Sequence, residues 1–326
     1  MIETLFKTIM TCPRFFRLAE EIAMALSEID AIRSLLGSKP RPVGWQERRS
    51  RIEEVGSVWP VASDIQCQKL DIGGIGGEWS IAPGSDPSHV LLYFHGGGYC
   101  SGSILSHRRL VTEAGRAARA RTLAIEYRLA PEHPFPAALD DAFTAWRFLR
   151  QSDIAAEHIA IGGDSAGGGL TIALINRLRE AGQQIPGCTW LISPWTDLTL
   201  SGSTLATKDD VDPIIRRAYL AELVAAYLPP GIERKDPRVS PLFADLRGLP
   251  PTLIQVGSSE TLLDDSTRFT AAAGAAGVAV TLEIWPDMIH AFPMWNAHLE
   301  AGRRALANAG EFIHRHTRSK SNKWSK

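Results

Sequence analysis

Cysteine is scarce in this sequence, which has four in 326 residues, at positions 12, 67, 100 and 188. No two of them form a C-x-x-C pair, and their spacing fits neither a zinc site nor a disulfide scaffold. We therefore expect no metal, no disulfide framework and a reducing, cytoplasmic location. Cys100 lies beside a run of glycines, and we interpret it as a small buried residue.

Long apolar runs and an excess of one charge are also lacking. No run approaches the about 20 apolar residues that span a bilayer, so we expect no stable membrane insertion. The 35 Lys and Arg residues nearly balance the 36 Asp and Glu residues, giving a net charge of -1. This balance argues against a nucleic-acid partner and against general attraction to anionic membranes.

The first residues, 1–32, do not form a convincing signal peptide, because charged residues interrupt their apolar positions. Those apolar positions recur at roughly helical spacing. We expect an amphipathic helix that packs on the body of the protein or on a partner subunit. A helix on a membrane surface is the less favoured alternative.

Short apolar runs alternate with helical segments along most of the chain. The expected strands are 66–72, 78–81, 90–94, 122–127, 159–161, 189–192, 252–256 and 280–285, and the expected helices include 107–120, 137–150, 262–276 and 293–314. Such alternation predicts an α/β fold with a mostly parallel sheet covered by helices on both faces. In such sheets, ligands bind at the carboxyl ends of the strands.

Two segments fall outside the alternation. Glycines at 73–77 resemble a nucleotide loop, but Trp79 stands where the last glycine of that motif should be, so a hairpin turn is expected. The block 196–240 has no strand signal and contains a helical run, 214–228. We interpret it as a cap inserted into a catalytic domain of residues 56–326, with residues 1–55 completing the cap.

A G-D-S-A-G motif at 163–167 lies between an expected strand and a helix. A serine on so sharp a turn needs small neighbours, and its hydroxyl is pushed out above the sheet. The helix that begins after it points its N-terminus at the same place, which favours an oxyanion. Ser165 is therefore the candidate nucleophile.

A nucleophilic serine needs a base, and the base needs an acid that fixes its tautomer. His290 follows the last expected strand, and Glu260 follows the strand 252–256, so both lie at carboxyl ends. Asp264 and Asp265 are rival acids, which we interpret as surface residues in the first turn of a helix, where the helix dipole favours them.

An H-G-G-G run at 95–98 directly follows the strand 90–94. Glycines let the backbone approach a substrate and aim its N–H groups inward. The expected oxyanion donors are the N–H groups of Gly96, Gly97 and Ala166. We expect His95 to order this loop rather than to transfer protons.

Together these motifs resemble the hormone-sensitive-lipase-like branch of the α/β-hydrolases, the bacterial carboxylesterases with an H-G-G-G loop and a G-D-S-A-G turn. The matching stretches are 95–99, 127–137, 163–168, 193–197 and 260–265, with His290 and Phe292. They occur in the family's order and run from about residue 65 to the end. In this family the acid is often aspartate, but a subgroup has glutamate, as at Glu260. Glu126, Asp164 and Asp197 are expected to be structural.

The resemblance implies an α/β-hydrolase fold with a helical cap and ester hydrolysis through an acyl-enzyme. Ser165, Glu260 and His290 would be the triad, and no cofactor or metal would be needed. It also implies short to medium acyl chains and a homodimer paired through the edge strand 280–285. The expected pocket residues, each with plain core packing as the alternative, are Tyr99, Trp195, Phe292 and Trp295.

Other activities stay open at this point. The same triad also serves amide, thioester or acetylated-sugar hydrolysis. A non-catalytic receptor for a small ligand is a further alternative, since plant gibberellin receptors resemble this family. Those receptors lack a usable triad histidine, so the presence of His290 argues against that reading.

Overall fold

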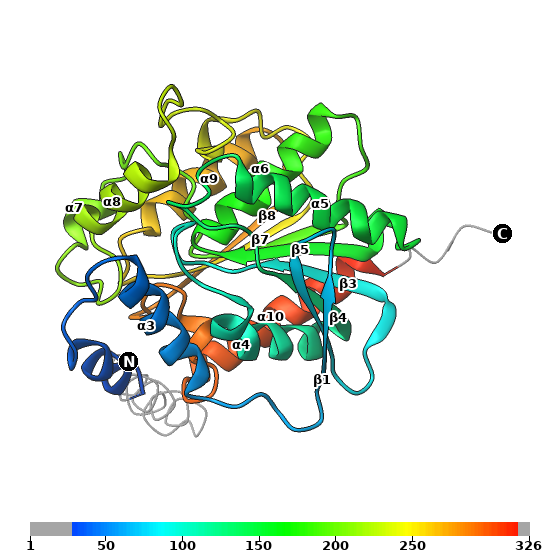
Figure 1. Ribbon diagram of the computed structural model, residues 1–326, viewed down its shortest axis with the longest axis horizontal. Helices are drawn as coiled ribbons and strands as arrows, with labels where there is room; N and C mark the ends of the chain where they lie inside the picture. Colours follow the sequence, from blue (N-terminus) through cyan, green and yellow to red (C-terminus); the bar gives the residue numbers. More distant parts are fainter. Residues whose placement is uncertain (1–27, 319–326) are drawn as a thin grey trace, which may run out of the picture.

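The computed structural model describes residues 28–318, so the predictions for residues 1–27 lie outside it. At its centre is an eight-stranded sheet in the order β1-β2-β4-β3-β5-β6-β7-β8 (Figure 1). Its strands are β1 (Gln66–Asp71), β2 (Gly76–Ile81), β3 (Asp86–Phe94), β4 (Ala120–Ile125), β5 (Ile159–Asp164), β6 (Cys188–Ile192), β7 (Thr252–Gly257) and β8 (Val280–Trp285). β2 pairs antiparallel with β1 and β4, and all the other pairs are parallel. The predicted mostly parallel sheet is confirmed.

The glycine cluster at 73–77 is a hairpin turn, as predicted. β1 and β2 pair in register on either side of it, with Asp71 opposite Gly76. Within the turn, the Ile72 N–H donates to the Ile75 carbonyl over 2.8 Å. Gly73 and Gly74 have positive φ angles of 64° and 91°, which glycine adopts without strain.

Helices cover both faces of the sheet (Figure 1). One face carries α4 (Ile104–Ala118) and α10 (Glu300–Thr317), and the other carries α5 (Ala137–Gln151), α6 (Ala166–Glu180) and α9 (Leu263–Ala275). α4 begins three residues before the expected position, because Ser103 and Ser106 form a capping box at its start.

The helix expected at 293–314 is divided in two, so that prediction was wrong in part. A short 3-10 helix, η3 (Phe292–Trp295), is followed by a break before α10 begins at Glu300. In the break, the Asn296 side chain donates to the Pro293 carbonyl over 3.0 Å. Such side-chain bonds to the backbone compete with the continuation of a helix.

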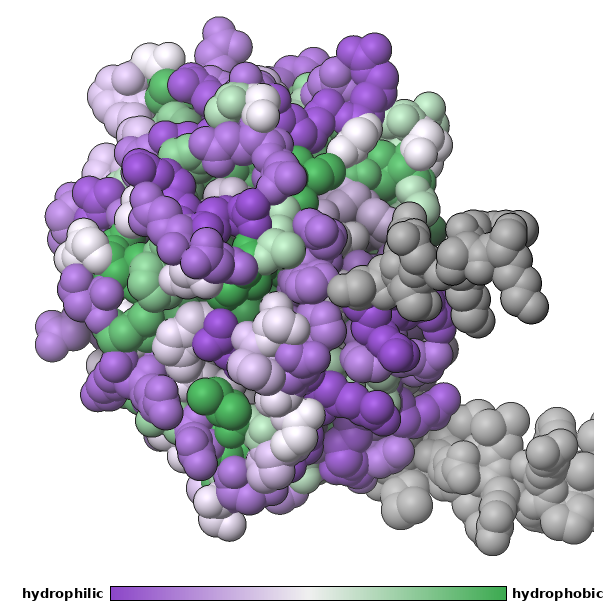
Figure 2. Space-filling model, turned by 90° about the vertical axis from the view of Figure 1, so that its right-hand side faces the viewer, coloured by the Kyte–Doolittle hydropathy of each residue, from purple (hydrophilic) through white to green (hydrophobic). Residues whose placement is uncertain are grey.

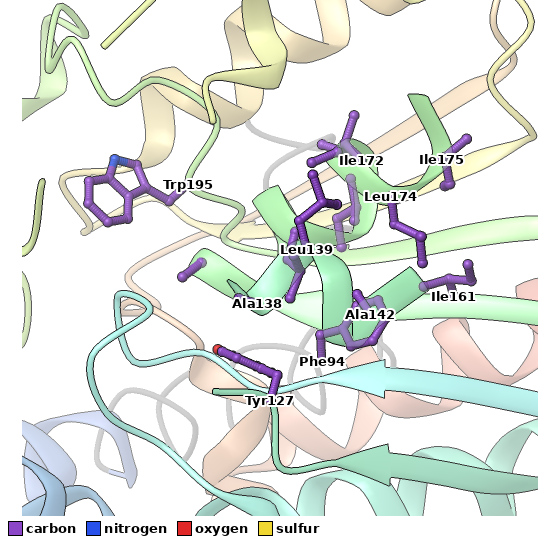
Figure 3. Packing of buried hydrophobic residues seen from close by; sticks show 14 of the residues in the cluster. Phe94, Tyr127, Ala138, Leu139, Ala142, Ile161, Ile172, Leu174, Ile175 and Trp195 are labelled. Carbon is purple, nitrogen blue, oxygen red and sulfur yellow. The ribbon is translucent and has the colours of Figure 1, made fainter. Parts of the chain in front are cut away.

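The main core lies between the sheet and the helices α5 and α6 that cover one of its faces. Figure 3 shows Phe94 and Ile161 from the strands meeting Leu139 of α5 and Leu174 of α6. These side chains are at most 4% exposed. Each contributes about 1.5–3 kcal/mol by leaving water. This packing holds β3 and β5 rigidly, and both strands end at the candidate site.

The two segments interpreted as a cap lie at one end of the sheet. α3 (Trp45–Ser57), α7 (Thr204–Thr207) and α8 (Arg217–Tyr227) are all on the left in Figure 1. Within the block 196–240, as expected, the structure has helices and no strand. The face at the other end is mainly hydrophilic, with small separate hydrophobic patches (Figure 2). Among residues 28–318, no helix is both long enough and apolar enough to cross a membrane.

Candidate active site

Ser165 occupies the sharp turn between β5 and α6. Its backbone has φ 52° and ψ -120°, a strained conformation for a residue with a side chain. A Cβ atom at Gly163 or Gly167 would collide with backbone atoms of the same turn or of β3, so both positions require glycine. The turn is fixed on both sides, because the Ser165 N–H donates to Ile192 O and the Ser165 carbonyl accepts from Trp195 N, each over 2.9 Å.

The expected acid and base lie together at the ends of β7 and β8. His290 Nδ1 is 3.1 Å from Glu260 Oε1. Glu260 Oε2 accepts from Ser193 Oγ over 2.7 Å and from Gly257 N over 2.9 Å. Glu260 is fully buried, and His290 is 4% exposed. Ser193 and Gly257 thus bind one oxygen of the carboxylate, and its other oxygen contacts the imidazole.

The charge of Glu260 changes the acidity of His290. Burial alone lowers the pKa of the imidazole, but the hydrogen bond and the charge of Glu260 outweigh it. The pKa of His290 is therefore raised above its ordinary 6.5. The charges of Asp212 and Asp164 act in the same direction. The site therefore favours the imidazolium, which forms when the base takes a proton.

Ser165 and His290 are connected through the end of β6 rather than by a direct bond. Within residues 28–318, no hydrogen bond joins Ser165 Oγ to His290. Instead, Ser165 N bonds to Ile192 O, and the next residue, Ser193, bonds to both Glu260 and Ala291 N. Catalytic hydrogen bonds of free enzymes often shorten only when substrate binds.

The glycine run differs from the expected set of oxyanion donors at Gly96. Gly96 N donates to Asp164 Oδ1 over 2.9 Å, so the expectation that it serves an oxyanion is wrong for this geometry. The N–H groups of Gly97 and Gly98 have no acceptor within the described residues. Both glycines have positive φ, and a Cβ at Gly98 would collide with Leu223 of α8. Ala166 N is among the first N–H groups of α6, which have no partner inside the helix.

Comparisons with known proteins identify the family of this chain. The sequence model of the α/β-hydrolase fold family matches residues 91–294. This chain belongs to the α/β-hydrolase family. A solved esterase of the bacterial hormone-sensitive lipase family is 40% identical, with a TM-score of 0.86, and the match covers 91% of this chain and 99% of that one. The resemblance found in the motifs is confirmed, and the chain is classed as a carboxylesterase of the hormone-sensitive-lipase branch.

Two curated relatives match most of this chain. An acetyl-hydrolase of Streptomyces hygroscopicus is 37% identical over 297 residues, which are 89% of this chain and 97% of the relative. An esterase of Acinetobacter venetianus is 36% identical over 264 residues, which are 81% of this chain and 87% of the relative. The first match leaves about a tenth of this chain uncovered, so it extends into the segments that we interpret as a cap.

In this α/β-hydrolase, Asp164 joins the nucleophile turn to the glycine loop. Its carboxylate accepts from Tyr93 OH over 2.8 Å and from Gly96 N, and it lies 3.3 Å from His107 Nε2. Burial raises the pKa of this carboxyl group, but His107 and Tyr93 outweigh burial and hold the pKa below its usual value. The prediction that Asp164 fixes loops by hydrogen bonds is confirmed.

The structural roles of other conserved-looking motif residues are also confirmed. His95 stacks on Tyr127 at 4.1 Å between ring centroids, and its burial beside His107 lowers its pKa to about 3. It is therefore neutral and orders the loop. Glu126 accepts from the first N–H of α4, at Ile104, over 2.9 Å.

Asp197 likewise stabilises a loop, the one that follows β6. It accepts hydrogen bonds from Thr199 and Ser201 and forms a 2.8 Å ion pair with Arg268. Its neighbour in space, Asp265, corrects a prediction, because it is fully buried rather than a surface residue. It accepts from Thr196 N and Asp197 N over 2.7 and 2.9 Å, and burial raises its pKa to about 7. The inserted segment covers this turn of α9.

Asp264, the other rival acid, is partly buried and accepts from Ser203 N over 2.6 Å. Its oxygens thus serve the inserted segment. Neither of the rival acids is hydrogen-bonded to His290, whereas Glu260 is. The structure therefore favours Glu260 among the three candidates.

The expected pocket residues belong to two different clusters. Tyr99 and Trp195 lie in the main core, and Tyr99 stacks on Tyr227 of α8 with 3.9 Å between centroids. The Trp195 indole lies apart from the other labelled side chains in Figure 3, and its Nε1 has no partner among the described residues. Tyr227, which pattern analysis did not single out, thus joins the group near the nucleophile turn.

Phe292 and Trp295 instead pack in a separate cluster with the helical residues 28–37. Trp295 contacts Trp59 edge-on at 5.0 Å between centroids. Their burial, 0% and 3% exposed, matches the core-packing alternative for these two residues.

No local sequence pattern points to Arg49, which connects α3 to the glycine loop. Its guanidinium donates to Cys100 O over 2.9 Å and to Ala130 O over 3.0 Å, and it pairs with Glu132 at 2.6 Å. The preceding residue, Arg48, forms an ion pair with Glu222 of α8. One helix therefore contacts both the glycine loop and the inserted segment.

Replacing Asp164 by asparagine tests its role. An amide has one accepting atom in place of two, so at least one of the three donors loses its acceptor. We expect Asp164→Asn to lower the free energy of unfolding by about 1–3 kcal/mol, measured by urea denaturation. Tyr93→Phe removes a single donor and should cost only about 0.5–1.5 kcal/mol. Equal stability of Asp164→Asn and the wild type would contradict this account.

Proposed function

We propose that this chain hydrolyses carboxylic esters through an acyl-enzyme formed on Ser165, with His290 as the base and Glu260 as the acid partner. The observation that supports the proposal most is the buried Glu260–His290 pair, with its 3.1 Å contact, at the sheet end where Ser165 stands on its strained turn. A buried carboxylate that holds the Nδ1 side of an imidazole leaves Nε2 free to take a proton.

In the proposed first step, Ser165 Oγ attacks the ester carbonyl while His290 Nε2 takes the hydroxyl proton. The carbonyl oxygen becomes an oxyanion held by backbone N–H groups. We assign Gly97, Gly98 and Ala166 as these donors, because Gly96 is engaged by Asp164. His290 then gives the proton to the departing alcohol, and in the second step it activates the water that releases the acid.

We also propose that residues 28–55 of the N-terminal segment and residues 196–240 of the insertion form a cap over the site. α3 and α8 lie at the end of the sheet that carries Ser165 (Figure 1). Leu223 of α8 lies against Gly98, and Arg49 of α3 holds the carbonyl of Cys100. A cap in this place excludes water from the acyl-enzyme and encloses the substrate.

The proposed substrates are esters with short to medium acyl chains. Tyr99, Trp195 and Tyr227 group large rings beside the turn, where Trp195 N donates to Ser165 O, and we expect these rings to limit the length of the acyl chain. One similar protein is named an acetyl-hydrolase. A solved esterase that was soaked with p-nitrophenyl butyrate is 41% identical, with a TM-score of 0.85, covering 89% of this chain and 98% of that one.

The edge strand β8 is the proposed contact between two copies of this chain. It pairs only with β7 among the described strands, and its Ile284 is 47% exposed. An unpaired strand edge with an exposed apolar residue favours pairing with another strand. These features support the proposal that two copies pair along β8.

A panel of p-nitrophenyl esters from acetate to palmitate tests the substrate class. We expect kcat/KM to peak at short or medium chains and to fall for the longest, because the rings limit the space for the acyl group. Chromogenic amides, thioesters and acetylated sugars, assayed in parallel, represent the alternative substrates. A higher kcat/KM for one of these classes, or for long-chain emulsions, would reject the assignment.

The Ser165→Ala variant tests the nucleophile. Without the hydroxyl no acyl-enzyme forms, so the rate of ester hydrolysis should drop roughly a thousandfold or more. Folding is checked by circular dichroism and thermal unfolding. If this variant kept wild-type turnover, or if the wild type bound esters without hydrolysing them, the proposal would fail, and the second result would favour a receptor.

The pH dependence of kcat/KM tests His290. The imidazole accepts a proton only when neutral, so activity should be lost as the pH falls through its pKa, which lies above 6.5. In Glu260→Gln the hydrogen bond to an ionised group and its charge are gone, and burial is opposed only by the charges of Asp212 and Asp164. We expect the midpoint of this acid limb to move to lower pH, while kcat decreases by up to about 10⁴-fold. An unchanged midpoint would argue against Glu260 as the partner of His290.

A further inference from the structure

Asp212 is a buried carboxylate in the inserted segment, between α7 and α8, and it reaches the loop of the triad acid. The residue is fully buried. Its Oδ2 accepts from Thr261 N over 2.9 Å and from Thr261 Oγ1 over 3.2 Å. Its Oδ1 accepts from Ile214 N and Ile215 N over 2.8 and 2.9 Å. All four bonds come from uncharged donors, and no Arg or Lys within residues 28–318 forms an ion pair with it.

Thr261, which donates to Asp212, directly follows Glu260 in the chain. Gly257 N and Ser193 Oγ hold the Glu260 carboxylate itself, whereas Asp212 holds the peptide group that follows Glu260. The loop that carries the acid is thus fixed from the sheet and from the inserted segment. A displacement of the inserted segment would therefore move the backbone of Glu260.

The N-terminal segment contacts the turn at residues 212–214. Arg41 donates to the carbonyl of Ile214 over 3.0 Å and to that of Pro213 over 3.3 Å. Three parts of the chain thus meet at residues 212–214: the N-terminal segment, the insertion and the loop of the triad acid. Capping of the local turn explains the bonds to Ile214 and Ile215. It does not explain why the second oxygen of Asp212 is directed to Thr261.

The charge of Asp212 also acts on the triad base. Asp212 forms no ion pair within residues 28–318, although the charge of Arg41 acts on it, and solvent screens the field of a buried carboxylate little. The charged groups that act on His290 are Glu260 at the end of β7, Asp212 in the insertion and Asp164 at the end of β5. All three are carboxylates, and each favours the imidazolium.

We propose that Asp212 is a positioning residue of the triad, which fixes the loop of Glu260 from the cap side and adds a negative charge, besides those of Glu260 and Asp164, that stabilises the His290 imidazolium. This inference rests on the proposed function, because it requires His290 to act as the base. It assigns to the inserted segment a part in the chemical step besides covering the substrate.

The test compares Asp212→Asn with Asp210→Asn, a matched change in the same loop at a fully exposed residue whose partner is Arg216. In Asp212→Asn we expect kcat for a short ester to fall roughly ten- to a hundredfold with little change in KM. We also expect the midpoint of the acid limb of kcat/KM to move to lower pH. Asp210→Asn should match the wild type in both. An acid limb that coincides with that of the wild type in Asp212→Asn, or a loss confined to KM, would overturn the proposal.

A second variant covers the case in which Asp212→Asn does not fold, which circular dichroism would reveal. Thr261→Val keeps the charge of Asp212 and removes one bond to it, so kcat should fall while the acid limb stays in place. A wild-type kcat in Thr261→Val would overturn the positioning role.

The Ser165→Ala control separates the two proposals. If ester turnover persists in Ser165→Ala, the proposed function fails, whatever Asp212 does. If turnover is lost in Ser165→Ala but the profile of Asp212→Asn overlays that of the wild type, only the inference about Asp212 fails.

Discussion

The buried carboxylate of Asp164 holds together the parts of the molecule that must meet at Ser165. It ends β5, and its oxygens receive Tyr93 of β3, His107 of α4 and the N–H of Gly96. A buried charge without such donors would be costly, so the carboxylate keeps these groups close to the nucleophile turn. The direction of the glycine loop at Gly96 and its connection to the nucleophile turn both depend on this one residue being buried and satisfied.

Much of the fold and of the candidate site could be predicted from local pattern. Apolar runs bounded by glycine or polar residues predicted the parallel strands. Since the carboxyl ends of parallel strands share one edge, Ser165, Glu260 and His290 were expected to converge there. The structure places Glu260 and His290 in contact after β7 and β8, and it places Ser165 at the end of β5, which is separated from β7 by β6. These predictions rest on periodicity and chain order, which the sequence carries directly.

What pattern analysis missed depends on contacts between distant segments. Which N–H group of a glycine run faces the substrate is decided by the acceptor behind it, and for Gly96 that acceptor is Asp164, 68 residues further along the chain. Asp265 looks like a surface acid in a first turn, but the inserted segment covers it. The break after Trp295 depends on a side-chain bond of Asn296 that helical periodicity does not register.

The attachment of the cap at Arg49 and at Asp212 has a consequence for how such enzymes diverge. The contacts of Arg49 with Cys100 and Ala130, and of Asp212 with Thr261, join cap residues to backbone groups beside the reacting atoms. A cap exchanged between two relatives would leave those buried groups unpaired unless its new residues supplied the same donors and acceptors. Residues of the proposed cap and the two loops below it would therefore have to be exchanged together for these buried groups to stay paired.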